Sequence, residues 1–338
     1  MNGGGGRIGE MDAGALEGGA AALAAAYRPV VIRGLAARWP LVAAAREGTG
    51  ALSSYLLGFD RGAEVEAFWA APGAGRRFFY AADMRGFNFE RRRGPLSGLL
   101  RYLEGIEAAA EPPAVYAGAL ETARLLPGLA EANPLPAAEA MGGVPRIWIG
   151  NASIVSTHFD ASDNIAVVAA GRRRFTLFPP DQIHNLYAGP LDHTMAGQPA
   201  SMVDLAAPDL DRYPRFAEAM AHAVSAELEP GDAIFIPALW WHHVEALSPV
   251  NVLVNYWWVD SPDMAARFDA MVYAATTIGP LPPERRAAWQ AMFDTFVFRK
   301  HGDPAEHLAP EHRGVLGTPT PRLRDYVRQY LLRGLQRP

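Results

Sequence analysis

The sequence predicts a mainly β protein, an antiparallel sandwich or barrel with helical sequence on both flanks. Between residues 144 and 258, short apolar runs alternate with turns rich in Gly and Pro, which is typical of many short strands in one sandwich. Residues 262–297 and 321–335 instead have the apolar spacing of helices. We therefore expect a core sandwich at 144–258 and a separate helical segment after it.

The first third of the chain mixes helical and extended patterns. Residues 1–28 are expected to form a flexible Gly-rich start and an Ala-rich helix, and PVVIRGL at 29–35 a short strand. A helix and a strand are expected within 51–72, a helix at 96–110 and a strand at 113–120. These elements would add an α/β layer on the N-terminal side of the sandwich.

Seven apolar runs are the expected strands of the sandwich. They are RIWIGN, NIAVVAAG, RFTLFPP, SMVDL (residues 201–205), SAELEPGDAIFIPA, HHVEAL and NVLVNYWW. With the preceding elements they would form one domain over residues 29–260. Residues 261–338 would then be a C-terminal helical region.

Composition excludes several classes of protein and site. The net charge of -5 gives no reason to expect nucleic acid or an anionic membrane as partner. Cysteine is absent, so any metal must be held by His, Asp or Glu, and a cytoplasmic location is expected. No targeting segment or membrane-length apolar stretch is evident. Lys300 is the only lysine among many arginines, which is typical of a GC-rich bacterial genome.

Three residues form a candidate metal site. STHFD contains His158 and Asp160, and residues i and i+2 of a strand point to the same side, so an imidazole and a carboxylate would face one pocket. WWHH offers a third ligand at His242 or His243. Two His and one carboxylate on one face leave three positions open, as in non-haem Fe(II) oxygenases.

Each part of this pattern also has a structural explanation. His-x-Asp is common, and two His beside two Trp could be a packed strand end. The order of the motifs favours the metal site, because one lies early and the other late in the β region. A double-stranded β-helix brings such strands together at its mouth.

Several motifs give the chain a specific resemblance. They are H-x-D at 158–160, Asn164, GRRRFTLFPPDQ at 171–182, PGDAIFIP at 230–237, WWHH at 240–243 and VNYWW at 254–258. Together with PVVIRGL, WP and FNF upstream, they make residues 25–260 resemble the cupin-like JmjC family of 2-oxoglutarate oxygenases. The likeness is greatest to the subgroup that contains the asparaginyl hydroxylase of hypoxia-inducible factor. It implies a jelly-roll or cupin core and Fe(II) bound by His158, Asp160 and His242, the first His after the paired Trp.

The resemblance also implies a 2-oxoglutarate site. Arg173 stands where the nearest subgroup has a lysine that binds the distal carboxylate, and a guanidinium binds a carboxylate as a planar fork. Asn164, Asn255 and Tyr116 match residues that line this site in relatives, although each could equally be a buried core residue. Relatives have Thr three residues before the first His, whereas this chain has Val155.

Substrate identity is less constrained. Trp257 shares a face with Asn255 and matches a residue at the substrate entrance, and Gln198 is all that remains of an Arg-Gln pair that contacts peptide in relatives. Arg76, Arg77 and Arg91–Arg93 form either a patch for an acidic partner or a solvated surface.

We expect an Fe(II)- and 2-oxoglutarate-dependent dioxygenase that hydroxylates a protein or peptide side chain. The alternatives are a demethylase, a small-molecule hydroxylase, a non-catalytic cupin-fold binding protein, and a Mn or Zn cupin, which commonly uses more histidines. The apolar stripe of the C-terminal helices suggests a homodimer, as in related hydroxylases. The sequence leaves the physiological substrate open.

Overall fold

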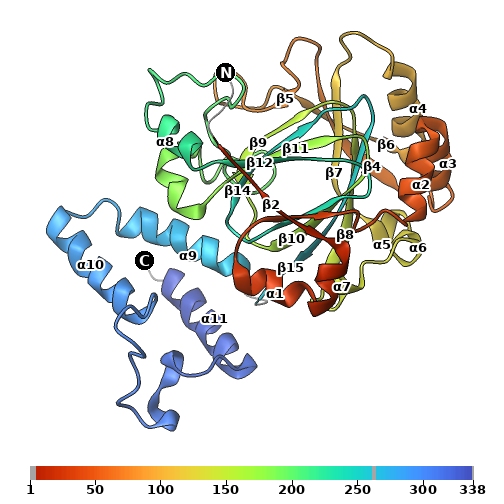
Figure 1. Ribbon diagram of the computed structural model, residues 1–338. Helices are drawn as coiled ribbons and strands as arrows, with labels where there is room; N and C mark the ends of the chain where they lie inside the picture. The colour runs from red at the N-terminus through yellow and green to blue at the C-terminus, as the bar shows by residue number, and fades with distance from the viewer. Residues whose placement is uncertain (1–4, 261–263, 337–338) are drawn as a thin grey trace. The chain divides into compact units, whose positions relative to one another are not determined.

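A computed structural model describes residues 5–260 and 264–336 of the chain (Figure 1). The chain divides into two compact units, the first running to Met264 and the second beginning at Ala265. No helix in these described residues is long and apolar enough to cross a membrane.

The first unit is built on two β-sheets. The six-stranded sheet has the order β1 (Gly6–Arg7), β12 (Val224–Leu228), β11 (Arg173–Phe178), β14 (Trp241–Ala246), β9 (Ile154–Phe159) and β5 (Arg77–Phe78). The nine-stranded sheet has the order β2 (Gly9–Asp12), β3 (Val30–Arg33), β13 (Ala233–Ile236), β10 (Asp163–Ala170), β15 (Asn251–Trp258), β8 (Val144–Gly150), β7 (Ala114–Glu121), β4 (Glu64–Ala70) and β6 (Glu90–Pro95).

Helices lie between these strands in the chain. They are the 3-10 helix η1 (Ala13–Gly18), α1 (Ala20–Ala26), α2 (Pro40–Glu47), α3 (Thr49–Leu57), α4 (Leu96–Ile106), α5 (Thr122–Leu125), α6 (Leu129–Ala132), α7 (Pro136–Glu139), the 3-10 helix η2 (Pro180–Asn185) and α8 (Phe216–Ala221). In α4, Leu96, Leu99, Leu100 and Leu103 are buried. This i, i+3, i+4, i+7 spacing forms the apolar face predicted from the sequence.

The strands from β8 to β15 form the predicted double-stranded β-helix. Along the chain they cross from one sheet to the other at every step except β11 to β12: β8, β10, β13 and β15 belong to the nine-stranded sheet, and β9, β11, β12 and β14 to the other. A mainly β fold with a cupin core and flanking helices is therefore confirmed. The alternation brings β9 and β14, which are far apart in sequence, into antiparallel register.

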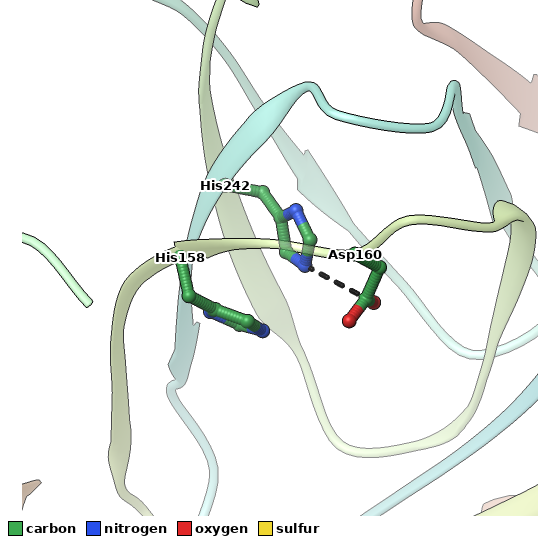
Figure 2. A group of neighbouring side chains, drawn as sticks. All are labelled: His158, Asp160 and His242. Carbon is green, nitrogen blue, oxygen red and sulfur yellow. Dashed lines mark ion pairs between the residues drawn. The ribbon is translucent and has the colours of Figure 1, made fainter. Parts of the chain in front are cut away.

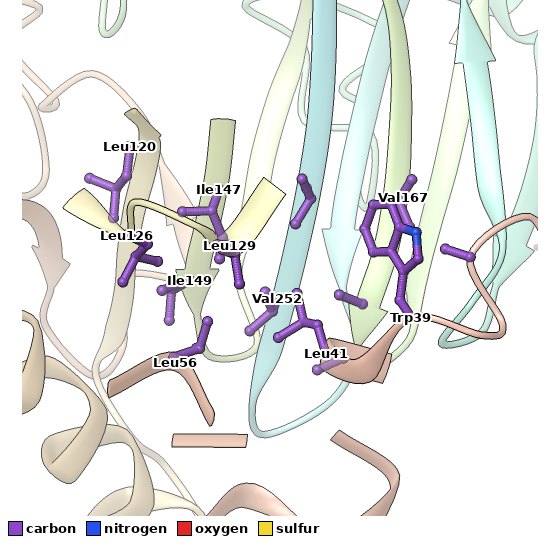
Figure 3. Close-up of a cluster of buried hydrophobic side chains, with 14 of the residues drawn as sticks. Trp39, Leu41, Leu56, Leu120, Leu126, Leu129, Ile147, Ile149, Val167 and Val252 are labelled. Carbon is purple, nitrogen blue, oxygen red and sulfur yellow. The ribbon is translucent and has the colours of Figure 1, made fainter. Parts of the chain in front are cut away.

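The nine-stranded sheet is buried on both faces around β10. Ile165 and Val167 pack in a cluster with Leu41 of α2, Leu56 of α3 and Trp39, which directly precedes α2 (Figure 3). Ala166 and Val168 point the other way, into a cluster shared with the six-stranded sheet. Burial on both faces explains why NIAVVAA is almost continuously apolar.

The N-terminal segment differs from expectation. Residues 5–12 were expected to be flexible, but β1 pairs with β12 and β2 with β3, both in parallel. Ile8 lies between the two strands and is buried in the cluster between the sheets. The Gly-rich composition concealed this because the stabilising contacts come from residues distant in sequence. Residues 1–4 lie outside the described residues.

The expected strand at 201–205 is also wrong. Only isolated bridges form here, between His158 and Ala200 and between Ala188 and Ser201. The Ser201 hydroxyl is buried and donates to the Leu186 carbonyl, and the Asp204 carboxylate then accepts from the Ala206 amide in a turn. These side-chain bonds, one to residue 186 and one within the turn, replace a continuous ladder.

The second unit is helical, as predicted. It contains α9 (Met264–Thr277), α10 (Pro283–Phe296), the 3-10 helices η3 (Pro310–His312) and η4 (Gly314–Leu316), and α11 (Pro321–Leu335). No residue of α10 or α11 is buried. Large apolar side chains are exposed on both helices, among them Trp289, Met292, Tyr330, Leu331, Leu332 and Leu335.

Candidate active site

A cavity of about 920 Å³ opens between the inner faces of the two sheets. Its size is typical of a small-molecule or cofactor site. The nine site residues expected from the sequence all line it: Tyr116, His158, Asp160, Asn164, Arg173, Gln198, His242, Asn255 and Trp257.

Strand pairing brings the three candidate metal ligands together. His158 on β9 lies directly opposite His242 on β14, and Asp160 follows β9 by one residue. One ligand atom from each lies within 4.8 Å of the others. The side chains converge on one point, with His242 Nε2 3.7 Å from Asp160 Oδ2 (Figure 2). This donor set suits a divalent transition metal and leaves positions open.

Hydrogen bonds fix the tautomer of both imidazoles. Nδ1 of His158 lies 2.8 Å from the Ser156 carbonyl, and Nδ1 of His242 lies 3.0 Å from the Trp240 carbonyl. Since a carbonyl can only accept, each Nδ1 carries the proton and each Nε2 keeps its lone pair for a metal. Burial, and then the neighbouring His158, lowers the pKa of His242 to about 4, so it is neutral near pH 7.

His243 faces the opposite side of β14. Its Nδ1 lies 3.2 Å from the Thr157 hydroxyl, which also faces away from the cavity. Burial, and then the Arg77 guanidinium, lowers the pKa of His243 to about 3. His243 is therefore a satisfied, neutral core residue and is not part of the three-ligand group.

Arg173 points into the cavity without a counterion. It is only 2% exposed, and its Nε has no hydrogen-bond partner in the described chain. No carboxylate within the described ranges forms an ion pair with it. Burial lowers its pKa, yet an arginine stays charged in proteins. A buried, unpaired guanidinium is costly unless an anion binds it.

The two expected asparagines differ in their bonding. The Asn164 Oδ1 atom is buried without a partner among the described residues. The Asn255 Oδ1 atom instead accepts from the Trp148 indole N–H at 2.7 Å, so its amide N–H₂ remains to donate. Asn255 is thus partly a core residue, as the alternative interpretation held, although its partner is a side chain.

Tyr116 belongs to an aromatic wall of the cavity. Its ring stacks on Trp148 and Phe78, with centroids 5.6 Å and 5.8 Å away. Burial raises its pKa, and the hydroxyl therefore stays protonated and able to donate.

Charged residues that the sequence did not predict to lie in the site complete the cavity lining. They are Glu64, Glu66, Arg93, Glu121, Arg124 and Arg146. The Arg146 guanidinium lies 5.8 Å from the Trp257 ring and 3.4 Å from Glu121. No motif marks these residues, because their position depends on the register of β4, β6, β7 and β8.

The expected surface patch of arginines is wrong in one member. Arg91, Arg92 and Arg93 are exposed and form ion pairs with Glu66 or Glu90. The Arg77 side chain is instead only 13% exposed and bonds to Ser156.

The chain is similar to known proteins of a cupin-like family. A family model described as Cupin-like domain matches residues 19–264. The human "Bifunctional peptidase and (3S)-lysyl hydroxylase JMJD7" is 30% identical over 263 residues, covering 68% of this chain and 77% of that protein. Arabidopsis thaliana "Lysine-specific demethylase JMJ31" is 35% identical over 114 residues, 33% of this chain and 20% of that protein.

Other matches are to parts of longer proteins. Human "HSPB1-associated protein 1" is 34% identical over 133 residues, 39% of this chain. The chain matches only 27% of the length of that protein.

Proposed function

This chain belongs to the cupin-like JmjC family of 2-oxoglutarate-dependent oxygenases, and on that premise we propose that it is an Fe(II) enzyme that hydroxylates a protein or peptide side chain. One observation carries the proposal. The ligand group of His158, Asp160 and His242 shares a single cavity with Arg173, a buried cation without a counterion in the described part of the chain. A metal and a dianionic cosubstrate would satisfy both features.

The donor set fits Fe(II). Two neutral imidazoles and one carboxylate are its usual ligands in such oxygenases, and both Nε2 atoms are free to bind. When bound, the iron supplies the chemistry that couples O₂ and 2-oxoglutarate, released as succinate and CO₂, to oxidation of a C–H bond. The protein holds the reactants in position and excludes water.

The cosubstrate would lie between the metal ligands and Arg173. Its distal carboxylate would accept from the Arg173 guanidinium as a planar fork and from the protonated Tyr116 hydroxyl. The free amide N–H₂ of Asn255 would donate to it, and the Asn164 side chain would complete the site. This arrangement would give a partner to the Arg173 Nε atom, which has none among the described residues.

A protein or peptide substrate is supported by the remainder of the cavity lining. Trp257 and Gln198 lie with charged side chains of both signs, which suit a polar chain better than a wholly apolar molecule. One relative is named a bifunctional peptidase and (3S)-lysyl hydroxylase, and another a lysine-specific demethylase. We favour hydroxylation; demethylation is the same oxidation applied to an N-methyl group.

The test is an anaerobic titration with Fe(II) and then 2-oxoglutarate. The expected result is the visible charge-transfer band of the chelate, absent in His158→Ala and Asp160→Ala. A folded wild type without the band would overturn the proposal, as would a band that both variants retain. Succinate release without added substrate would separate an active centre from a non-catalytic binding protein.

We also propose that the chain forms a homodimer through its C-terminal helices. The exposed Leu331, Leu332 and Leu335 on α11 form an apolar surface that a second copy would cover. Light scattering should give twice the chain mass, and Leu332→Asp should halve it. A monomeric wild type at micromolar concentration would contradict this.

A further inference from the structure

Arg77 is an unusual arginine because its side chain is only 13% exposed and it lies on the strand next to the one that carries His158. It lies on β5, which pairs in parallel with β9, the strand that carries His158. Its guanidinium stacks on the Phe79 ring at 3.7 Å and reaches the half-exposed Asp204 at 3.7 Å. It is not among the residues that line the cavity, although its bonding partner Ser156 is.

The guanidinium bonds to two separate segments. Its Nε donates to the Ser156 hydroxyl at 2.9 Å. Its Nη2 donates to the carbonyls of Ser201 at 3.4 Å and Val203 at 3.1 Å. The planar fork thereby ties β9 to the segment 201–203.

Both segments bear on the site. The Ser156 carbonyl accepts the Nδ1 proton of His158, and this bond orients the ring toward the metal position. The Ser201 amide donates to the Thr157 carbonyl at 2.7 Å, and Ala200 pairs with His158. Residues immediately before this pairing, Gln198 among them, line the cavity.

We propose that Arg77 is a positioning residue that fixes both the His158 imidazole and the cavity-lining segment that ends at Ala200. The proposal rests on the metal site proposed above. One guanidinium sets the distance between β9 and the segment 201–203, and so couples metal binding to the substrate side of the cavity. A lysine could keep the charge but not the fork, and a methionine would remove both.

The first measurement is Co(II) affinity under anaerobic conditions, with Co(II) as the probe for the iron position. Arg77→Met should weaken Co(II) binding about tenfold, since groups that orient a ligand contribute about 10- to 100-fold to affinity. The Co(II) affinity of Arg77→Lys should lie between those of Arg77→Met and the wild type. Arg92→Met is the matched control, because Arg92 also stacks on a ring and pairs with a carboxylate but contacts neither segment.

The second measurement is hydrogen exchange in the metal-free protein. The amides of Ser201 and Met202 are bonded to carbonyls and should be protected in wild type. Arg77→Met should speed their exchange about tenfold while Arg92→Met leaves it unchanged. A merely structural role would instead lower the melting temperature, with Co(II) affinity and this exchange unaltered, and that outcome would overturn the proposal.

Ser156→Ala keeps the proposal testable if both Arg77 variants fail to fold. It removes the hydroxyl that Arg77 binds and retains the carbonyl that His158 needs. A loss of about threefold in Co(II) affinity supports the proposal, and an unchanged affinity overturns it. If the wild type binds no Co(II), the proposed metal site is wrong. Hydrogen exchange of the Ser201 and Met202 amides would still show whether Arg77 holds the segment 201–203.

Discussion

The six-stranded sheet carries two pairs of adjacent, identical residues, Arg173–Arg174 and His242–His243. In each pair one side chain lies on the inner face and the other on the outer face, and their bonding partners differ. On the outer face Arg174 pairs with Glu227 at 2.6 Å and Glu245 at 3.2 Å, and His243 is bonded to Thr157. On the inner face Arg173 has no counterion among the described residues, and His242 faces the two other candidate metal ligands. Because buried polar groups are normally paired, the inner face is incomplete without ligands, whereas the outer face is already satisfied. Substitutions at these adjacent positions should therefore have very different effects.

The largest difference should be between His242 and His243, in their effect on metal affinity. We expect His242→Ala to weaken Fe(II) or Co(II) binding by more than about 100-fold, because one of only three ligands is lost. His243→Gln should change the affinity by less than about tenfold, the lower limit for groups that only support a ligand. Metal titration followed by the 2-oxoglutarate charge-transfer band measures both. A band that survives in His242→Ala and disappears in His243→Gln would reverse the assignment.

The second largest difference should be between Arg173 and Arg174, in the KM for 2-oxoglutarate. Arg173→Met should raise the KM for 2-oxoglutarate about 100-fold, equivalent to about 2.7 kcal/mol, since a bidentate charged bond is lost. Arg174→Met removes two surface ion pairs, together worth about 1 kcal/mol of stability or less, and should leave this KM within about twofold. Succinate release against 2-oxoglutarate concentration provides the comparison. Equal effects at the two positions would show that Arg173 is not the anchor.

Arg173→Met should weaken the binding of 2-oxoglutarate but stabilise the protein against unfolding. In the metal-free, ligand-free protein, Arg173→Met should raise the free energy of unfolding by about 1–3 kcal/mol, because it removes a buried charge without a partner. Arg174→Met should lower it by less than about 1 kcal/mol. Urea unfolding measures both changes, with circular dichroism of the native state as control. A large loss of stability in Arg173→Met would mean that the guanidinium already has a stabilising partner.

Strand periodicity made the inner and outer faces predictable. The alternation of Arg173 and Arg174, like that of His242 and His243, follows from the two-residue repeat of a strand. The motif order also predicted the double-stranded β-helix, which is confirmed. Local spacing could not give the position of Arg77, whose partners lie on β9 and at 201–203. Its sequence context, RRFF, is the same whether the side chain is solvated or buried.

The other differences between the sequence prediction and the structure arise from contacts between residues far apart in the chain. A Gly-rich start contains no signal for β1, because its stability comes from pairing with β12, more than 200 residues later in the chain. SMVDL has the apolar content of a strand, but the buried Ser201 hydroxyl and the turn at Asp204 prevent a ladder. The charged cavity lining depends on strand register, which motifs do not encode.

Val155 should give the smallest effect and the sharpest test of cavity polarity. It lines the cavity three residues before His158, where members of the resembling family have Thr. Val155→Thr is nearly isosteric, and a new hydroxyl bond to the cosubstrate should lower the KM for 2-oxoglutarate about threefold, or about 0.7 kcal/mol. Val244→Thr is the matched control, because Val244 lies opposite Val155 on β14 and also lines the cavity. An equal gain in both variants would indicate a general effect of polarity, and a gain in neither would place the cosubstrate away from β9.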